Sequence, residues 1–344
     1  NVRHKVGHAF ELRAQRRLAA AICVALGERA VRRQARDPDD VTALPPVTLS
    51  YQVKPFEFEL ATDWTPLDSQ GLTDSFWNSI FSEASSASQV TFHDIDSDGL
   101  PDRVMRKAYS PFDNFVVQFN NGKLNGGTGF QAARNWGPLD SQGITDEYWN
   151  SPSSFSSAHL QVSLYDINAD GRLDRVMRKA YSPFDNFVVQ LNNGAGFDSA
   201  QNWGPLDSQG LTDGFWNSPL ADDSVSTQVA FYDVNGDGLP DRVMRMANSP
   251  FNKFKVQLNT GSGFGSAIDW APLDSQGLTD NFWNSIISFG GGHVQVGIYD
   301  INGDGLPDRV MRKAYSPFDQ FVVQLNNGAG FEPAENWGPL DSQG

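Results

Sequence analysis

The sequence predicts an all-β protein built from repeated units, each with about four short strands. Short runs of alternating apolar and polar residues, such as Val90–Phe92 and Val229–Phe231, are typical of half-buried strands. Gly, Pro, Asn and Asp separate these runs, and no long helical periodicity follows residue 45. The same motifs return about every 70 residues, which is typical of a repeat array.

Each unit is predicted to begin with a Phe-x-x-Ala-x-x-Trp segment and to end after a strand such as Phe115–Phe119. Within the predicted repeat region 46–344, the complete units are 58–129, 130–196, 197–263 and 264–330, and 331–344 starts a fifth. Phe331–Trp337 would then be a strand without its own sheet, and such edges are usually covered. We expect it to pair with Val47–Val53 of the same chain, which would close a small ring, or with the N-terminal segment of another copy. We favour the second arrangement, which predicts self-association into a filament or surface structure.

An acidic motif, Asp-x-(Asp/Asn)-x-Asp-Gly-x-x-Asp, occurs four times, and we call these segments the first to fourth loops (94–102, 166–174, 233–241 and 300–308). Oxygen atoms at positions 1, 3, 5, 7 and 9 can surround a hard cation of the size of Ca²⁺, position 7 through its backbone carbonyl. Gly at position 6 permits the sharp turn. The sequence therefore predicts four Ca²⁺ sites, with these ligands: Asp94, Asp96, Asp98, Leu100 and Asp102; Asp166, Asn168, Asp170, Arg172 and Asp174; Asp233, Asn235, Asp237, Leu239 and Asp241; Asp300, Asn302, Asp304, Leu306 and Asp308.

The four loops do not match the EF-hand, which needs a bidentate Glu at position 12 and flanking helices. Position 12 is Met105, Met177, Met244 or Met311, and a strand-like run precedes each loop. An acidic turn that binds nothing is the simpler alternative, because Asp, Asn and Gly favour turns in any case. Four copies with every ligand position filled favour the cation site.

The loop followed by Phe-x-Val-Gln-Leu-Asn-Asn-Gly-x-Gly-Phe resembles the FG-GAP or VCBS repeat, over residues 58–344. The resemblance implies a calcium-binding β-propeller of four-stranded blades, as in integrin α heads and in propeller regions of bacterial Rhs-type and Tc-type secreted proteins. It implies calcium ligands at Asp94, Asp96, Asp98, Asp102 and the equivalent positions. The family's usual ring has seven blades, whereas this chain has four complete units.

Charge and cysteine content indicate the compartment. The formal net charge is −15, and the four loops supply much of it, so the acidity favours metal sites and gives no sign of nucleic-acid binding. The single Cys23 allows no internal disulfide. Extracellular calcium modules bind with Kd of about 10⁻⁴ to 10⁻³ M, too weakly to fill in the cytosol. We therefore expect a secreted protein, extracellular or at the cell surface.

Residues 1–45 form a basic arm of different composition. Ala, Leu and Arg favour a helix over about 10–26, which Gly27 would end. A basic run followed by the apolar segment Leu18–Leu26 is also typical of a signal peptide. The segment is too short to span a bilayer, so we expect a helix packed against the repeats or against another copy, and no membrane span.

Enzymatic motifs are missing from the sequence. The five His residues show no ligand spacing, and there is no Gly-x-Ser-x-Gly or Gly-rich phosphate loop. The Asp-Ser-Gln-Gly element recurs in every unit, which is typical of a structural turn. The sequence therefore predicts a protein that is not an enzyme and has no catalytic residues.

Four repeated tryptophans carry a second hypothesis, because each has an Asp and an Asn close by, as in sugar-binding sites. Packing between blades would suit these bulky rings equally well. The residues concerned are Trp77, Trp149, Trp216 and Trp283.

The prediction drawn from these observations is a non-enzymatic, calcium-stabilised repeat scaffold for adhesion or self-assembly. Arg103–Gln118 and Arg175–Gln190 are identical, and Arg309–Gln324 differs only at Gln320, which suits a scaffold more than one unique pocket. Two alternatives are a multivalent lectin that binds a glycan or cell-surface ligand, and the propeller portion of a secreted toxin complex.

Overall fold

The computed structural model describes residues 63–341 except 73–74, 123–128, 145–146, 157, 212–213, 224 and 279–281. The chain divides into two compact units, Asn1–Leu60 and Ala61–Gly344, and all the described residues belong to the second. The predicted arm 1–45, its helix over 10–26 and the predicted strand Val47–Val53 lie outside the described residues.

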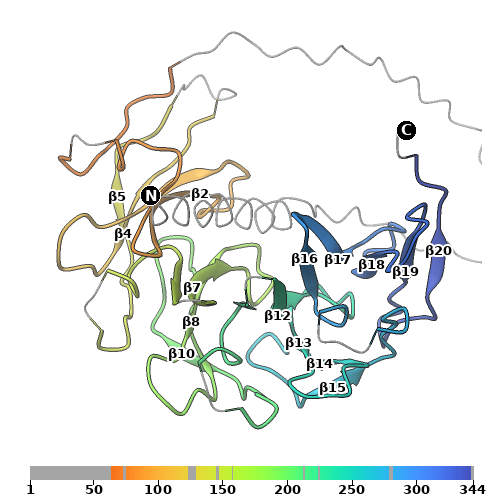
Figure 1. The fold of residues 1–344 in the computed structure, drawn as a ribbon. Helices are drawn as coiled ribbons and strands as arrows, with labels where there is room; N and C mark the ends of the chain where they lie inside the picture. The colour runs from red at the N-terminus through yellow and green to blue at the C-terminus, as the bar shows by residue number, and fades with distance from the viewer. Residues whose placement is uncertain are drawn as a thin grey trace, which may run out of the picture. The chain divides into compact units, whose positions relative to one another are not determined.

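The prediction of an all-β protein is confirmed for the described residues, which contain strands and turns and no α-helix. The strands fall into four groups of five, and the groups follow one another in chain order (Figure 1). We call β1–β5 the first group, β6–β10 the second, β11–β15 the third and β16–β20 the fourth. Their bounds are β1 Ser82–Ala84, β2 Ala87–His93, β3 Asp102–Arg106, β4 Phe115–Gln118, β5 Arg134–Trp136, β6 Ser154–Ser156, β7 His159–Tyr165, β8 Asp174–Arg178, β9 Phe187–Gln190, β10 Gln201–Trp203, β11 Ala221–Asp222, β12 Ser226–Tyr232, β13 Asp241–Arg245, β14 Phe254–Gln257, β15 Ile268–Trp270, β16 Ile287–Gly290, β17 His293–Tyr299, β18 Asp308–Arg312, β19 Phe321–Gln324 and β20 Glu335–Trp337.

Within each group the strands pair antiparallel in sequence order, as a meander. Short pairings join neighbouring groups, for example Ala87 with Ser154 and Ala221 with His159. Among the described strands, the fourth group pairs with β12 and not with the first group, so strand pairing does not close the sheet. Each group has one strand more than the four predicted. The additional strands β1, β6, β11 and β16 have only 3, 3, 2 and 4 residues, too few for an alternating pattern to identify them as it identifies β2.

The predicted unit boundaries need correction, because they fall inside paired sheets. Phe130 forms a bridge with Asn120, and β5 pairs with β4, so the Phe-x-x-Ala-x-x-Trp segment ends a group and does not begin one. The same holds at the predicted fifth unit, since β20 pairs with β19 of the fourth group. The expectation that Phe331–Trp337 lacks a sheet of its own is therefore wrong.

The Asp-Arg-Val-Met-Arg strand of each group is buried on both faces. In β3, Val104 packs with Phe115 and Trp136, whereas the adjacent Met105 packs with Trp77 in a separate apolar cluster. Successive residues of a strand point to opposite faces, so this one strand contributes to two cores.

One of these cores is shared between consecutive groups. Phe197, which precedes β10, meets Phe115 of β4 edge to face at 5.9 Å between ring centroids. Phe264 meets Phe187 in the same way, and Phe331 meets Phe254, both at 6.0 Å. Burying an aromatic ring stabilises by about 1.5–3 kcal/mol, so each group depends on its neighbour for part of its core.

The turn before each of these phenylalanines needs glycine because two backbones approach closely. A Cβ on Gly263 would lie 2.5 Å from the carbonyl oxygen of Gly204. We expect Gly263→Ala to lower the free energy of unfolding by about 1–3 kcal/mol, as over-packing does. Urea denaturation measures this.

The matched control is Gly265→Ala, where the nearest atom to the new Cβ would be the carbonyl oxygen of Leu258 at 3.6 Å. Here we expect a change within about 0.5 kcal/mol. Equal stability of the two variants would contradict the close approach as the reason for Gly263.

Candidate metal centre

Each acidic loop connects the second and third strands of its group, as a tight turn between β2 and β3 in the first group. The glycines at position 6 have φ of +90°, +88°, +90° and +90°, in the left-handed region where a side chain is strained. The N–H of position 7 donates to the carboxylate of position 5, for example Leu100 N to Asp98 Oδ1 and Leu239 N to Asp237 Oδ1, both at 2.8 Å. Arg172 and Leu306 make the same bond. The residues at positions 5 to 7 therefore fold as the motif predicts.

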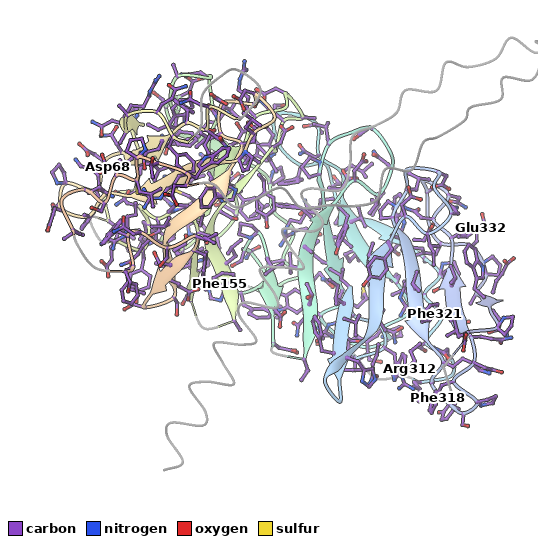
Figure 2. The ribbon with its side chains drawn as sticks, turned by 90° about the horizontal axis from the view of Figure 1, so that it is seen from above. Asp68, Phe155, Arg312, Phe318, Phe321 and Glu332 are labelled. Atoms are coloured by element: carbon purple, nitrogen blue, oxygen red, sulfur yellow. The ribbon has the colours of Figure 1, made fainter. Side chains whose placement is uncertain are left out.

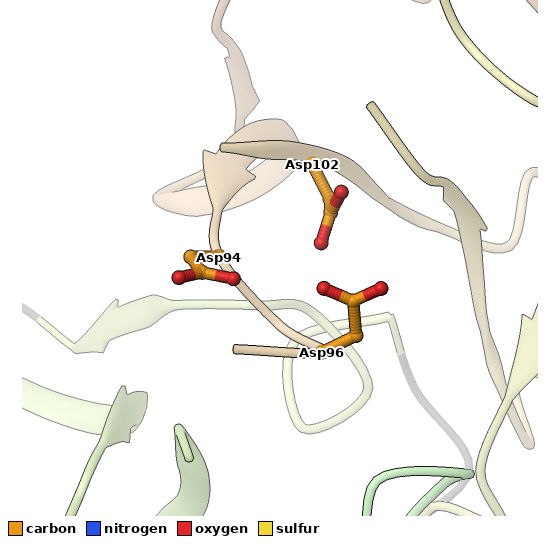
Figure 3. A group of neighbouring side chains, drawn as sticks. All are labelled: Asp94, Asp96 and Asp102. Carbon is orange, nitrogen blue, oxygen red and sulfur yellow. The ribbon is translucent and has the colours of Figure 1, made fainter. Parts of the chain in front are cut away.

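In the first loop three carboxylates converge. Asp94, Asp96 and Asp102 each offer an oxygen within 4.8 Å of the others, and Figure 3 shows the carboxylates of Asp96 and Asp102 facing each other. One oxygen of Asp94 accepts the N–H of Gly99 at 2.9 Å, while Oδ1 is buried and receives no hydrogen bond. A buried carboxylate oxygen without a donor is costly unless a cation neutralises it.

The pKa directions in the first loop have the same physical cause. Burial, and to a smaller extent the nearby carboxylates of Asp96 and Asp98, raises the pKa of Asp102 to about 7, although the N–H groups of Asn120 and Ile95 lower it. Burial also raises the pKa of Asp96, together with the carboxylates of Asp98 and Asp94. The loop thus concentrates negative charge at a place that water solvates poorly, which is the environment a hard dication stabilises.

The second, third and fourth loops have the same turn with a different position 3. Their Asn side chains donate to the carboxylate of position 5, as Asn235 Nδ2 does to Asp237 Oδ2 at 2.9 Å. Asn168 and Asn302 do the same. The carboxylates at position 1, Asp166, Asp233 and Asp300, accept N–H groups of positions 5 and 6. Among the described residues, only the first loop therefore brings three carboxylates within 4.8 Å.

The aspartates at position 9 are completely buried, each with 0% exposure. Asp102 accepts the N–H of Ile95 at 3.1 Å and that of Asn120 at 2.9 Å. Asp174, Asp241 and Asp308 have equivalent partners. Burial raises the pKa of Asp174 and Asp241 to about 7, and it also raises that of Asp308.

The asparagines that bind these aspartates were not predicted from the sequence, and they are Asn120, Asn192, Asn259 and Asn326. In every group the asparagine stands two residues after the glutamine that ends the fourth strand, a constant position that could have marked it. Asn is also an ordinary turn residue, so this repetition was the only distinguishing feature.

The residues fit a calcium-type ion best in the first loop. The donor set consists of oxygen atoms alone, one of them is buried without a hydrogen-bond donor, and three carboxylates are already close together. The other loops offer three carboxylates and one amide on the same backbone turn.

The four predicted ligand-binding tryptophans lie in the interior. Trp77, Trp149, Trp216 and Trp283 are 4%, 4%, 7% and 6% exposed. The last arginine of the Asp-Arg-Val-Met-Arg strand that follows in the same group covers each ring, as Arg312 does over Trp283 at 5.6 Å from the ring centroid. The same arginine contacts the phenylalanine of the Ser-Pro-Phe turn, as Figure 2 shows for Arg312 and Phe318. The rings therefore serve packing, and they do not form the open stacking platform that the lectin hypothesis needs. The neighbouring Asp74, Asp146, Asp213 and Asp280 lie outside the described residues.

The repeated Asp-Ser-Gln-Gly element forms a structural turn where the structure describes it. Asp140 Oδ1 accepts the N–H of Gln142 at 2.6 Å, and the Gln142 side chain bonds the backbone of Arg178 and Ala180. A side chain that is fixed in this way serves the turn.

No helix among the residues the structure describes has the length and apolar character needed to span a bilayer.

No protein-family model and no curated protein sequence matches this chain. Among solved structures, it is similar to an Agrocybe aegerita lectin described for specific recognition of non-reducing terminal N-acetylglucosamine, with a TM-score of 0.40 and 18% identity over 75% of this chain and 67% of that chain. It is also similar to the Photorhabdus luminescens Tc holotoxin pore, with a TM-score of 0.30 and 15% identity over 74% of this chain and 12% of that chain. Both TM-scores are below 0.5, a level at which neither fold nor function transfers to this chain.

The burial of the tryptophans gives a prediction about stability. We expect Trp216→Ala to lower the free energy of unfolding by about 3–5 kcal/mol, because it leaves a cavity beside Val229 and Met244 and removes the ring under Arg245. Thermal or urea unfolding measures the loss. Tyr181→Ala is the control, since Tyr181 is 67% exposed and should change stability by less than about 0.5 kcal/mol. A Trp216→Ala protein as stable as the control would show that the ring is not part of the core.

Proposed function

We propose that the protein is a non-enzymatic, extracellular repeat scaffold for adhesion or self-assembly, in which calcium stabilises FG-GAP-type propeller blades. The observation that carries the proposal is the first loop, where three carboxylates converge around a buried Asp94 oxygen that has no hydrogen-bond donor. The meander groups, with one face packed on the next group, support the interpretation of each group as a blade.

In this proposal the residues of each loop have distinct tasks. In the first loop, Asp94, Asp96 and Asp98 supply carboxylate oxygens, and the Gly99 N–H holds the Asp94 carboxylate in place. Asp102 supplies a further oxygen and fixes the loop to the start of β3. When bound, a calcium ion would neutralise carboxylates that otherwise repel one another.

Two observations favour a scaffold over an enzyme. The motif strands and turns repeat with almost identical sequence and identical hydrogen bonds, whereas catalysis needs one specially arranged site. Asp-Ser-Gln-Gly, which combines an acid with a hydroxyl, is engaged in its own turn. Millimolar calcium outside the cell would fill sites with Kd of about 10⁻⁴ to 10⁻³ M, which is why we propose a secreted protein.

Calcium removal tests the proposal directly. At 1 mM calcium each site of that affinity would stabilise by about 0.4–1.4 kcal/mol, or roughly 2–6 kcal/mol for four sites. We therefore expect a chelator to lower the Tm clearly and calcium to restore it. Magnesium should not restore it, because it requires a smaller octahedral site. An unchanged Tm, together with no calcium bound in equilibrium dialysis, would refute the proposal.

Asp94→Asn should reduce the number of calcium ions bound by one, because it weakens the position-1 ligand at the oxygen that lacks a donor. The control is Asp113→Asn, which makes the same charge change in an exposed ion pair with Lys107. This variant should bind the full number, since exposed ion pairs contribute about 0–1 kcal/mol and Asp113 is outside the loops. Isothermal titration calorimetry gives the stoichiometry of both.

Asn235→Asp gives the third loop the position-3 residue of the first loop. The substitution replaces an amide that donates to Asp237 with a carboxylate that repels it. We expect a lower Tm in chelator and tighter calcium binding, since affinity rises with the number of charged ligands. Asn336→Asp, an exposed position in β20, is the control and should change neither. Calcium affinity that does not change on Asn235→Asp would argue against position 3 as a ligand.

A further inference from the structure

A continuous path of hydrogen bonds links all four loops. Within a group, the position-9 carboxylate accepts the N–H of loop position 2 and the N–H of the asparagine that follows the fourth strand. Between groups, the side chain of that asparagine donates to the position-2 carbonyl of the preceding loop. The path runs from Asp102 through Ile95 and Asn192 to Asp174, and then in the same way to the third and fourth groups.

The step between groups has the same geometry three times. The Nδ2 to carbonyl oxygen distance is 2.8 Å from Asn192 to Ile95, 2.7 Å from Asn259 to Ile167 and 2.8 Å from Asn326 to Val234. The three asparagines are 2%, 3% and 2% exposed. Water therefore does not replace these bonds.

The first group offers a natural contrast. Asn120 also binds its own position-9 aspartate through its N–H, and its amide donates to the carbonyl of Pro101 in its own group at 3.1 Å. Asn192 makes the corresponding bond to Leu173 at 3.2 Å in addition to the bond to Ile95. Among the described residues, Asn192 thus has a hydrogen bond to the loop of the preceding group, and Asn120 has no such bond.

Neighbouring loops are also in direct contact. Ser97 Oγ, at position 4 of the first loop, donates to the carbonyl of Gly171 in the second loop at 2.7 Å. In the third loop, a Cβ on Gly236 would lie 3.0 Å from Leu306 of the fourth loop. The first and second loops are therefore side by side, and so are the third and fourth loops.

We propose that Asn192, Asn259 and Asn326 are positioning residues for the cation site of the preceding group, and that cation binding at consecutive loops is coupled through them. The inference rests on the proposed calcium binding and adds to it. The asparagines supply no ligand atom in this proposal. They fix the peptide that carries the ligands.

The position of Ile95 gives the physical reason. Its N–H belongs to the peptide that follows Asp94, and its carbonyl belongs to the peptide that precedes Asp96. Asp102 accepts the N–H and Asn192 donates to the carbonyl, so both peptides between two proposed ligands are held. Without Asn192 the buried carbonyl loses its inter-group donor, and the peptide is less firmly oriented. Outer residues of this kind commonly change metal affinity by about 10- to 100-fold.

Coupling follows from the same bond, because linkage is reciprocal. A cation that orders the first loop holds the Ile95 carbonyl where Asn192 can bind it. Asn192 also donates its N–H to Asp174, so the order of one loop affects the position-9 residue of the next. Occupancy of one site should then raise the affinity of its neighbour.

Calcium titration of the full chain by calorimetry tests the inference with a matched pair of variants. Asn192→Ala should weaken one calcium site by about 10- to 100-fold, whereas Asn120→Ala should cause a clearly smaller loss. Asn259→Ala repeats the test at the second loop. When Asn192→Ala is combined with Asp94→Asn, which removes the first site, the large effect of Asn192→Ala should disappear.

Each outcome decides a separate question. Equal losses in Asn192→Ala and Asn120→Ala, or a large effect that persists with Asp94→Asn, would overturn the inference and leave calcium binding intact. A wild-type chain that binds no calcium would overturn both. If Asn192→Ala unfolds in chelator, we compare the calcium concentrations that restore the circular dichroism spectra of Asn192→Ala and Asn120→Ala. The inference predicts a higher concentration for Asn192→Ala, and equal concentrations would overturn it.

Discussion

A buried carboxylate at the start of each Asp-Arg-Val-Met-Arg strand is the constraint on which the rest of the structure depends. Asp102, Asp174, Asp241 and Asp308 are wholly buried, and each accepts two main-chain N–H groups. An ionised carboxylate in this environment is expensive unless it is neutralised or fully hydrogen-bonded. The raised pKa of Asp102 shows that two N–H donors do not compensate for burial and for the carboxylates of Asp96 and Asp98. In our proposal, a cation bound by the oxygen atoms of the surrounding loop would balance this charge.

The same strand carries two further buried charges, Arg103 and Arg106 in the first group, and Arg106 forms an ion pair with Glu147 at 2.9 Å. Arg103 donates hydrogen bonds to the backbone carbonyls of Asp68 and Trp77 and to the side-chain oxygen of Gln118. Burial lowers the pKa of its equivalents Arg175, Arg242 and Arg309 to about 9. Carbonyl dipoles can hold a guanidinium because its five donors are spread over a planar fork. The same buried partners recur around this strand in every group, which is consistent with its identical sequence in all four groups.

The sequence alone predicted the structure where a short motif determines its own geometry. The loop glycines take part in the predicted sharp turn, with φ in the left-handed region, and the alternating runs before them are strands. It failed where the partner lies outside the motif. Phe130–Trp136 has a strand pattern, but only the pairing of β5 with β4 shows that it ends a group. Trp216 suited either a binding platform or a core, and its packing under Arg245 decides for the core. Asn192 reads locally as a turn residue, and nothing near it in sequence indicates a bond to Ile95.

The position of the loops gives the array a property that composition alone would not suggest. In repeat proteins, stability is approximately the sum of the stability of each repeat and of the contacts between neighbours. Here the acidic loop takes part in both, because Asp102 joins the strands of its own group while Ile95 in the same loop accepts the side chain of Asn192 from the next. The phenylalanine contact between Phe115 and Phe197 lies at the same junction. A change that disorders one loop would therefore weaken both its own group and the junction with the next group. The stability of each junction should then depend on the charge of the loop as well as on the apolar contacts.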